Sequence, residues 1–190
     1  MVTLNKIYTR TGDGGTTRVV TGQELPKTHP RIVAIGDVDE LNAAIGAAIG
    51  AITLDDIRGS LLAVQNDLFD LGADLATPQE IKGELRLSAK GVERLEAMID
   101  EINDDLPALT SFVLPSGPGG AGVLHVARAV ARRAERSVWS LTALPDEEAH
   151  LNPAVPKYLN RLSDYLFVAA RRVSREAGGE VMWVPGGPQN

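Results

Sequence analysis

Apolar residues recur at intervals of three and four over five long stretches of this chain, the spacing of helices that each bury one face. These stretches lie at roughly 29–50, 57–75, 88–102, 121–141 and 154–176. No segment of any length alternates apolar and polar residues with a period of two, so we expect no substantial sheet. The pattern predicts an all-α, up-and-down bundle of five helices.

Local signals mark several helix ends. Thr77-Pro78 closes the second helix, because proline cannot continue a helical turn. Ser88 is a suitable N-cap for the third helix. Gly178-Gly179 ends the fifth helix. The helix boundaries therefore follow from local chemistry as well as from periodicity.

Small and polar residues line one flank of the first helix and would let another helix approach closely. These residues are Asp39, Asn42, Ala43, Gly46 and Gly50.

The fourth helix has two distinct faces. At about 100° per residue, Arg128, Arg132 and Glu135 share one stripe. An arginine row on a rigid helix suits phosphate, because the guanidinium is permanently charged and binds two oxygens at once. A solvated or salt-bridged surface is the alternative interpretation. The separate apolar face consists of Leu124, Ala127, Ala131, Ala134, Val138 and Leu141.

Three segments do not follow the helical pattern: residues 1–30, 107–120 and 178–190. Linkers and frayed ends are the simplest interpretation. In the first segment, however, glycines alternate with hydroxyls and a cation, so that backbone N–H groups are free to surround an anion. It is not a P-loop, since GxxxxGK[ST] is absent, and an ordinary surface turn is the alternative. The residues are Thr9, Arg10, Thr11, Gly12, Asp13, Gly14, Gly15, Thr16 and Thr17.

A polar stripe also runs along the fifth helix. Its members are Asn160, Asp164, Phe167 and Arg171. Asn160 is flanked by apolar residues and is expected at a buried edge, where an amide needs defined partners. It could contact a nucleoside or orient another helix.

The composition indicates one domain over residues 1–190 with an aliphatic core, since 44% of the residues are hydrophobic and only 4% aromatic. The absence of cysteine excludes disulfides, thiolate metal sites and thiol nucleophiles. A net charge of −6 argues against a general nucleic-acid binder. Neither a membrane-length apolar run nor a signal-peptide pattern is present, which predicts a cytoplasmic protein.

Several motifs, in order, resemble the ATP:cob(I)alamin adenosyltransferases of the trimeric, propanediol-utilisation class. They are KIYTRTGDGGTT, GDVDELNAAIG, QNDLFDLGADLATP, SFVLPSG, LHVARAVARRAER and YLNRLSDYLFVAAR. One departure lies at Pro115–Gly120, which reads PSGPGG where the family commonly has PGG. The resemblance covers nearly the whole chain, and the departure affects only the shape of that loop.

The resemblance implies a homotrimeric five-helix bundle with its active site between adjacent subunits. The N-terminal loop (1–30) of one chain and the fourth and fifth helices would bind ATP, with the corrinoid beside it. Cob(I)alamin would attack the 5′-carbon of ATP and expel triphosphate, giving adenosylcobalamin. Mg²⁺ would be held mainly by the phosphate oxygens of ATP, with no metal ligand from the protein. A reductase for cob(II)alamin and an adenosylcobalamin-dependent mutase are possible partners.

The reaction needs fixed cations near the leaving triphosphate, and Arg132, with Arg10 or Lys27, is our candidate. By resemblance, Asp39 and Arg128 form an ion pair across the subunit interface. Also by resemblance, Phe112 covers the lower axial face of the corrinoid; simple core packing is the alternative. The resemblance places ATP contacts at Thr9, Arg10, Thr11, Gly12, Asp13, Gly14, Gly15, Thr17, Lys27, Arg132, Glu135, Arg136 and Asn160.

No general base is required, so His29, His125 and His150 are interpreted as structural or exposed. Glu147-x-x-His150 matches only half of a di-iron carboxylate motif and receives little weight.

Two other functions are compatible with parts of the pattern. A helical regulator or nucleic-acid binder could use the arginine stripe without chemistry, although the acidic net charge counts against it. A different ATP-using transferase would need the glycine loop and Arg132 but no corrinoid. Neither protein would need Phe112.

Overall fold

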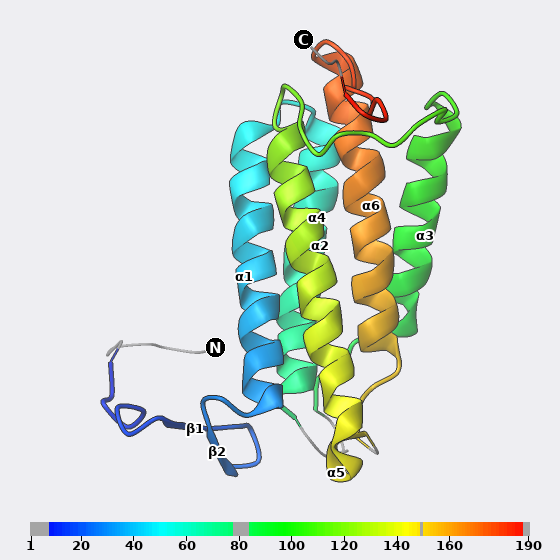
Figure 1. The fold of residues 1–190 in the computed structure, drawn as a ribbon. Coiled ribbons are helices and arrows are strands. Elements are labelled where there is room, and N and C mark those ends of the chain that lie inside the picture. The colour runs from blue at the N-terminus through cyan, green and yellow to red at the C-terminus, as the bar shows by residue number, and fades with distance from the viewer. Residues whose placement is uncertain (1–7, 78–83, 149, 188–190) are drawn as a thin grey trace.

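Five long helices stand side by side in a bundle in the computed structural model, which describes residues 8–77, 84–148 and 150–187 (Figure 1). The five-helix prediction is confirmed. The long helices are α1 (Pro30–Ala51), α2 (Asp55–Leu75), α3 (Ala89–Asp104), α4 (Ala121–Trp139) and α6 (Ala154–Glu176). None of the described helices is long and apolar enough to cross a membrane.

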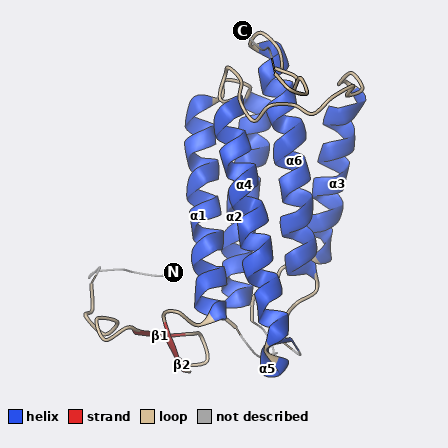
Figure 2. Cartoon of the chain, viewed as in Figure 1, coloured by secondary structure: helices blue, strands red, loops and turns tan. Residues whose placement is uncertain are grey.

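Smaller elements lie at the end of the bundle where α1 begins (Figure 2). The fourth helix ends at Trp139, slightly earlier than expected, because the chain tightens there into a 3-10 turn, η1 (Ser140–Ala143), followed by α5 (Pro145–Glu148). Before α1, β1 (Thr16–Arg18) and β2 (Glu24–Pro26) form an antiparallel hairpin. Strands of three residues are too short to produce a recognisable period-two pattern.

The expected helix ends at Ser88 and Gly179 are present, and His29 is a further cap that was not predicted from the sequence. His29 accepts a hydrogen bond from Arg31 N at the start of α1, and Ser88 accepts one from Lys90 N at the start of α3. Gly179 N donates to Ser174 O (2.7 Å), closing the end of α6. Pro78, the expected stop signal after α2, lies outside the described residues.

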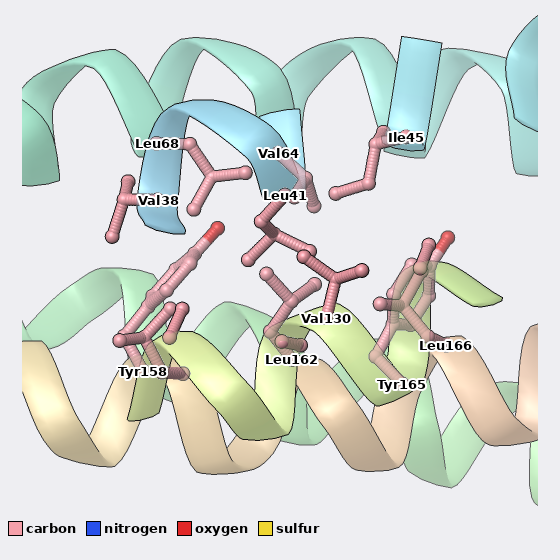
Figure 3. Packing of buried hydrophobic residues seen from close by; sticks show 14 of the residues in the cluster. Val38, Leu41, Ile45, Val64, Leu68, Val130, Tyr158, Leu162, Tyr165 and Leu166 are labelled. Carbon is pink, nitrogen blue, oxygen red and sulfur yellow. The ribbon is translucent and has the colours of Figure 1, made fainter. Parts of the chain in front are cut away.

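The core lies between α1, α2, α4 and α6, with α3 packed against α6 (Figure 3). The predicted apolar face of α4 is confirmed, because all six of its residues are fully buried. Aliphatic side chains such as Leu41, Leu68 and Leu162 fill most of this space. Tyr158 is also buried there, and its hydroxyl donates to Asp67 (2.7 Å).

The small flank of α1 faces a helix of the same chain over part of its length. Asn42 and Gln65 exchange two hydrogen bonds, each from a side-chain amide to the other residue's carbonyl oxygen (3.1 Å). A Cβ at Gly46 would lie 3.2 Å from Gln65 Nε2. The close approach that the sequence predicted is therefore made here by α2.

A buried carboxylate joins three segments at the lower end of the bundle. Asp74 accepts hydrogen bonds from Arg86 (2.7 Å), Leu87 N (2.8 Å) and Asn152 (2.6 Å). Asn152 also caps the start of α6 by accepting from Ala154 N. This network ties the connections before α3 and α6 to the end of α2.

Candidate active site

The N-terminal loop has the backbone of a strained, glycine-rich turn. Arg10 has a φ of 62° and Gly15 a φ of 84°. The left-handed region is uncommon for a residue with a side chain, and such residues concentrate at functional sites. Gly15 N donates to Gly12 O (3.2 Å), and the hydroxyls of Thr9 and Thr11 are 2.9 Å apart.

Lys27 directly follows the second strand of the β hairpin and contacts this loop. Its N–H donates to Gly15 O (2.9 Å), and its Nζ would lie only 3.1 Å from a Cβ at Gly12. Glycine at position 12 therefore makes room for the ammonium group. The neighbouring hollow of about 450 Å³ is lined by Thr11, Gly12, Thr16, Thr17, Arg18 and Glu24. Of the expected phosphate-binding residues, the structure thus brings Gly12, Gly15 and Lys27 together and places Thr11 and Thr17 at the same hollow.

The arginine stripe on α4 contains two cations that the fold leaves unpaired. Among the described residues, neither Arg128 nor Arg132 has an acidic partner within 4 Å, whereas the adjacent Arg133 pairs with Asp37 and Glu40. Burial, together with the charge of Arg132, lowers the pKa of Arg128. Within the described chain, therefore, no ion pair neutralises Arg128 or Arg132, and the solvated interpretation stays open for the exposed Arg132.

Asn160 lies beside this stripe and has the defined partners that its sequence context predicted. Its Nδ2 donates to Glu135 Oε1 (3.3 Å), and its Oδ1 accepts from Arg161 (2.9 Å). Because Glu135 is on α4 and Asn160 on α6, this contact fixes the two helices against each other. Arg136, also expected to contact ATP, is exposed and donates to Arg132 O (2.9 Å).

Phe112 lies in the loop before α4, at the end of the bundle opposite to the one where α1 begins. Its side chain is 77% exposed, so the core-packing alternative is wrong. Trp183 N donates to Phe112 O (2.7 Å), and Leu114 N donates to Val181 O (2.8 Å). The rings of Phe112 and Trp183 are 6.0 Å apart.

Our sequence interpretation missed this pairing and left 178–190 as a tail. The described part, through residue 187, is not a frayed end, because Met182 forms a β-bridge with Val113. The apolar run in EVMWV after two glycines was the available signal.

The glycines of Pro115–Gly120 are required by close packing. A Cβ at Gly119 would lie 2.9 Å from the Ala177 side chain, and one at Gly120 would lie 2.9 Å from Ile52. Gly120 also adopts a φ of 95° as the N-cap of α4. The unusual PSGPGG sequence therefore forms a compact turn against the end of α6.

Asp39 is exposed on α1, and no ion pair joins it to Arg128 among the described residues. It borders a largely apolar groove of about 540 Å³ between α1 and α2. Phe69, on the α2 side of this groove, is 71% exposed. This face of the bundle has the character of a protein interface.

The predicted site residues therefore form three groups, around Gly12–Gly15, Arg132 and Phe112. Figure 1 shows the N-terminal loop extending outward from the beginning of α1, whereas the loop before α4 lies at the other end. A single chain does not bring the first group onto the α4 stripe.

The histidines and candidate metal ligands have structural positions. His125 is buried beside Phe167, with ring centroids 6.2 Å apart, and His150 is exposed. Glu147 pairs with the buried Arg31. No group of three His, Cys, Asp or Glu side chains in the described segments could hold a metal ion.

Comparisons with known proteins agree with the motifs and the fold. Residues 7–173 match the sequence profile of a family described as cobalamin adenosyltransferase. A corrinoid adenosyltransferase from Mycobacterium tuberculosis is 48% identical over 190 residues, covering 98% of this chain and 96% of that protein.

Two solved structures of a PduO-type ATP:corrinoid adenosyltransferase from Lactobacillus reuteri are also similar, each 37% identical over 94% of this chain. A phenylalanine-to-alanine variant complexed with cobalamin and ATP has a TM-score of 0.86, with 99% of its chain covered. An arginine-to-lysine variant complexed with ATP has a TM-score of 0.84, with 100% covered.

Proposed function

This chain belongs to the cobalamin adenosyltransferase family, and we propose that its reaction takes place along the α4–α6 stripe, between two subunits. The enzyme transfers the 5′-deoxyadenosyl group of ATP to the cobalt of cob(I)alamin. The electron pair of Co(I) forms the Co–C bond, while the bond from C5′ to the triphosphate oxygen breaks and its electrons leave with triphosphate. The products are adenosylcobalamin and triphosphate.

The main support for this location is that neither Arg128 nor Arg132 has an acidic partner among the described residues. Negative charge grows on the leaving triphosphate, and a fixed cation stabilises that charge without reorganisation during the reaction. Arg132 is exposed and free to contact phosphate. Glu135 and Asn160 lie on the same stripe and would contact ATP, with Glu135 also orienting the amide.

The second half of the ATP site would come from the N-terminal loop of a neighbouring subunit. The turn at Gly12–Gly15 has open space around Gly14 and Gly15, and Lys27 and Arg10 add cations to it, a combination that suits phosphate. Thr9, Thr11, Asp13 and Thr17 would complete this side of the nucleotide. We propose that Mg²⁺ accompanies ATP and is held mainly by the phosphate oxygens, which are the hard ligands that this cation prefers.

The assembly we propose is a homotrimer whose contacts include the apolar groove between α1 and α2. The groove exposes Phe69 and borders Asp39, so a neighbouring subunit would cover apolar surface and place Arg128 opposite Asp39. That ion pair would hold Arg128 beside the phosphate-binding Arg132.

Phe112 would face the lower axial side of the corrinoid. An exposed aromatic ring there excludes water and the nucleotide base of the cofactor, leaving cobalt four-coordinate and easier to reduce. We further propose that the enzyme acts in the cytoplasm, receives electrons for cob(II)alamin from a reductase and delivers its product to an adenosylcobalamin-dependent mutase.

The direct test mixes the purified protein, ATP and chemically reduced cobalamin without oxygen. Formation of the Co–C bond changes the visible spectrum, and stoichiometric triphosphate should appear with it. Omission of ATP is the control. ATP turnover that is independent of corrinoid would favour the alternative transferase, and absence of Co–C bond formation would contradict the proposed function.

A further inference from the structure

One buried guanidinium near the end of α6 holds two separate segments of the chain. The Arg171 side chain is 3% exposed, and its Nε donates to Glu180 Oε1 (2.7 Å). Its Nη2 donates to Pro107 O (2.8 Å). The carboxylate of Glu180 is itself only 8% exposed. Arg171 therefore joins the start of the 107–120 loop to the chain beyond α6.

The position of this pair is unusual for an interaction that stabilises the bundle. A buried ion pair gains little free energy over apolar packing, because desolvation of both charges offsets their attraction. Glu180 lies beyond the last residue of α6, outside the packed helices. Ser174 adds a second link to the same segment by donating from its hydroxyl to Gly179 O (2.7 Å).

Both segments lead within a few residues to the exposed aromatic pair. The loop runs from Pro107 to Phe112, and the tail runs from Glu180 to Trp183. Two hydrogen bonds also join the segments directly. The Trp183 carbonyl oxygen accepts one from Ser111 Oγ (2.8 Å), and the Trp183 N–H donates the other to Phe112 O (2.7 Å). Without the ion pair, these hydrogen bonds would hold the two segments together, and water would compete for them because the backbone there is partly exposed.

We infer that Arg171 and Glu180 are positioning residues, which set the place of Phe112 against the corrinoid through the tail and the loop. This inference rests on the proposed role of Phe112. Neither residue touches a substrate. The pair acts by holding the ends of the two segments, so its loss should weaken corrinoid binding and the four-coordinate state of cobalt while leaving the ATP site intact.

The experiment compares Glu180→Ala with the parent enzyme and with Arg172→Met. Arg172 is the next residue of α6, and it pairs with Asp105 and Glu176 rather than with the tail. Glu180→Ala alters a residue outside the bundle, so circular dichroism should show the parent's helix content. Arg171→Met is the second variant, and Glu180→Gln, which keeps an acceptor for Arg171, should restore part of the parent behaviour.

Three measurements distinguish positioning from simple stabilisation. Amide hydrogen exchange should rise in both 107–114 and 180–184 in Glu180→Ala and Arg171→Met. The KM for the corrinoid should rise by about tenfold or more, with the KM for ATP within about twofold of the parent. The Co(II) spectrum of the bound corrinoid should lose its four-coordinate component. Arg172→Met should match the parent in all three.

Different results would overturn the inference. Unchanged exchange in the loop after Glu180→Ala would show that the pair does not hold it. Faster exchange with unchanged corrinoid KM and Co(II) spectrum would show a structural role only. A failure of the proposed function would appear instead as a parent enzyme that forms no Co–C bond, and loop exchange would then still decide whether the pair joins the two segments.

Discussion

Arg132 and Arg133 are adjacent in the sequence, yet their side chains have different surroundings. Arg133 is neutralised by Asp37 and Glu40 of α1, whereas Arg132 has no acidic partner in the described chain. Arg132 therefore keeps an available positive charge for a ligand. This difference makes Arg133 a matched control for the phosphate-binding role.

Substitution of Arg132 by alanine should weaken ATP binding and slow transfer, because one charge-assisted contact to the triphosphate is lost. Such a contact contributes about 1.5–3 kcal/mol, so we expect a reduction of about ten- to a hundredfold. Calorimetry of ATP binding and the visible-spectrum assay measure the two effects. The exposed position of Arg132 should leave the thermal midpoint unchanged. Equal losses in Arg132→Ala and Arg133→Ala would contradict a specific role.

Phe112→Ala should leave stability nearly unchanged, because an exposed side chain contributes only about 0.5 kcal/mol or less when it is far from core packing. ATP affinity should also stay near the parent value. The main loss should appear when the reaction starts from Co(II), because a lower ligand can then reach cobalt and make reduction harder. A milder defect is expected with Co(I) supplied. A large fall in thermal stability with an unchanged Co(II) spectrum would place Phe112 outside the site.

The helices and the loops differ in how much of their packing could be predicted from the sequence. The apolar face of α4 was predictable because its burial depends on positions three and four apart on one helix. The contact between Phe112 and Trp183 was not, since it joins segments about seventy positions apart through backbone hydrogen bonds that carry no side-chain pattern. The arginine stripe could be placed on α4, but which arginines stay unpaired depends on acids contributed by α1.

The buried carboxylate of Asp74 gives a test of how the connections are held to α2. Asp74→Ala would leave Arg86 and the N–H of Leu87 without this acceptor, and removal of one partner from a buried charged network typically costs about 3–5 kcal/mol. We expect a clearly lower midpoint in urea unfolding. Asp100→Ala, an exposed substitution on α3, is the control. Equal midpoints for the two variants would show that the network contributes little.

At the scale of the whole molecule, the proposed site is divided between features that lie apart in one chain. The N-terminal loop extends away from the bundle (Figure 1), the arginine stripe lies on α4, and an apolar groove bordered by Asp39 remains open on α1 and α2. A neighbouring subunit would resolve all three features, by covering the groove and completing the ATP site. Activity should therefore depend on assembly.

A charge exchange between Asp39 and Arg128 tests that dependence. Arg128→Glu should place two carboxylates opposite each other across the interface, reducing both activity and the trimer fraction in sedimentation. Asp39→Arg alone should also be defective, because it would face Arg128 and add to the positive charge. The double variant restores an opposite-charge pair and should recover part of both losses, with a coupling of about 0.5–3 kcal/mol between the two sites. Additive losses in the double variant would contradict the Asp39–Arg128 pairing. A fully active monomer at assay concentration would contradict the proposal that two subunits share the site.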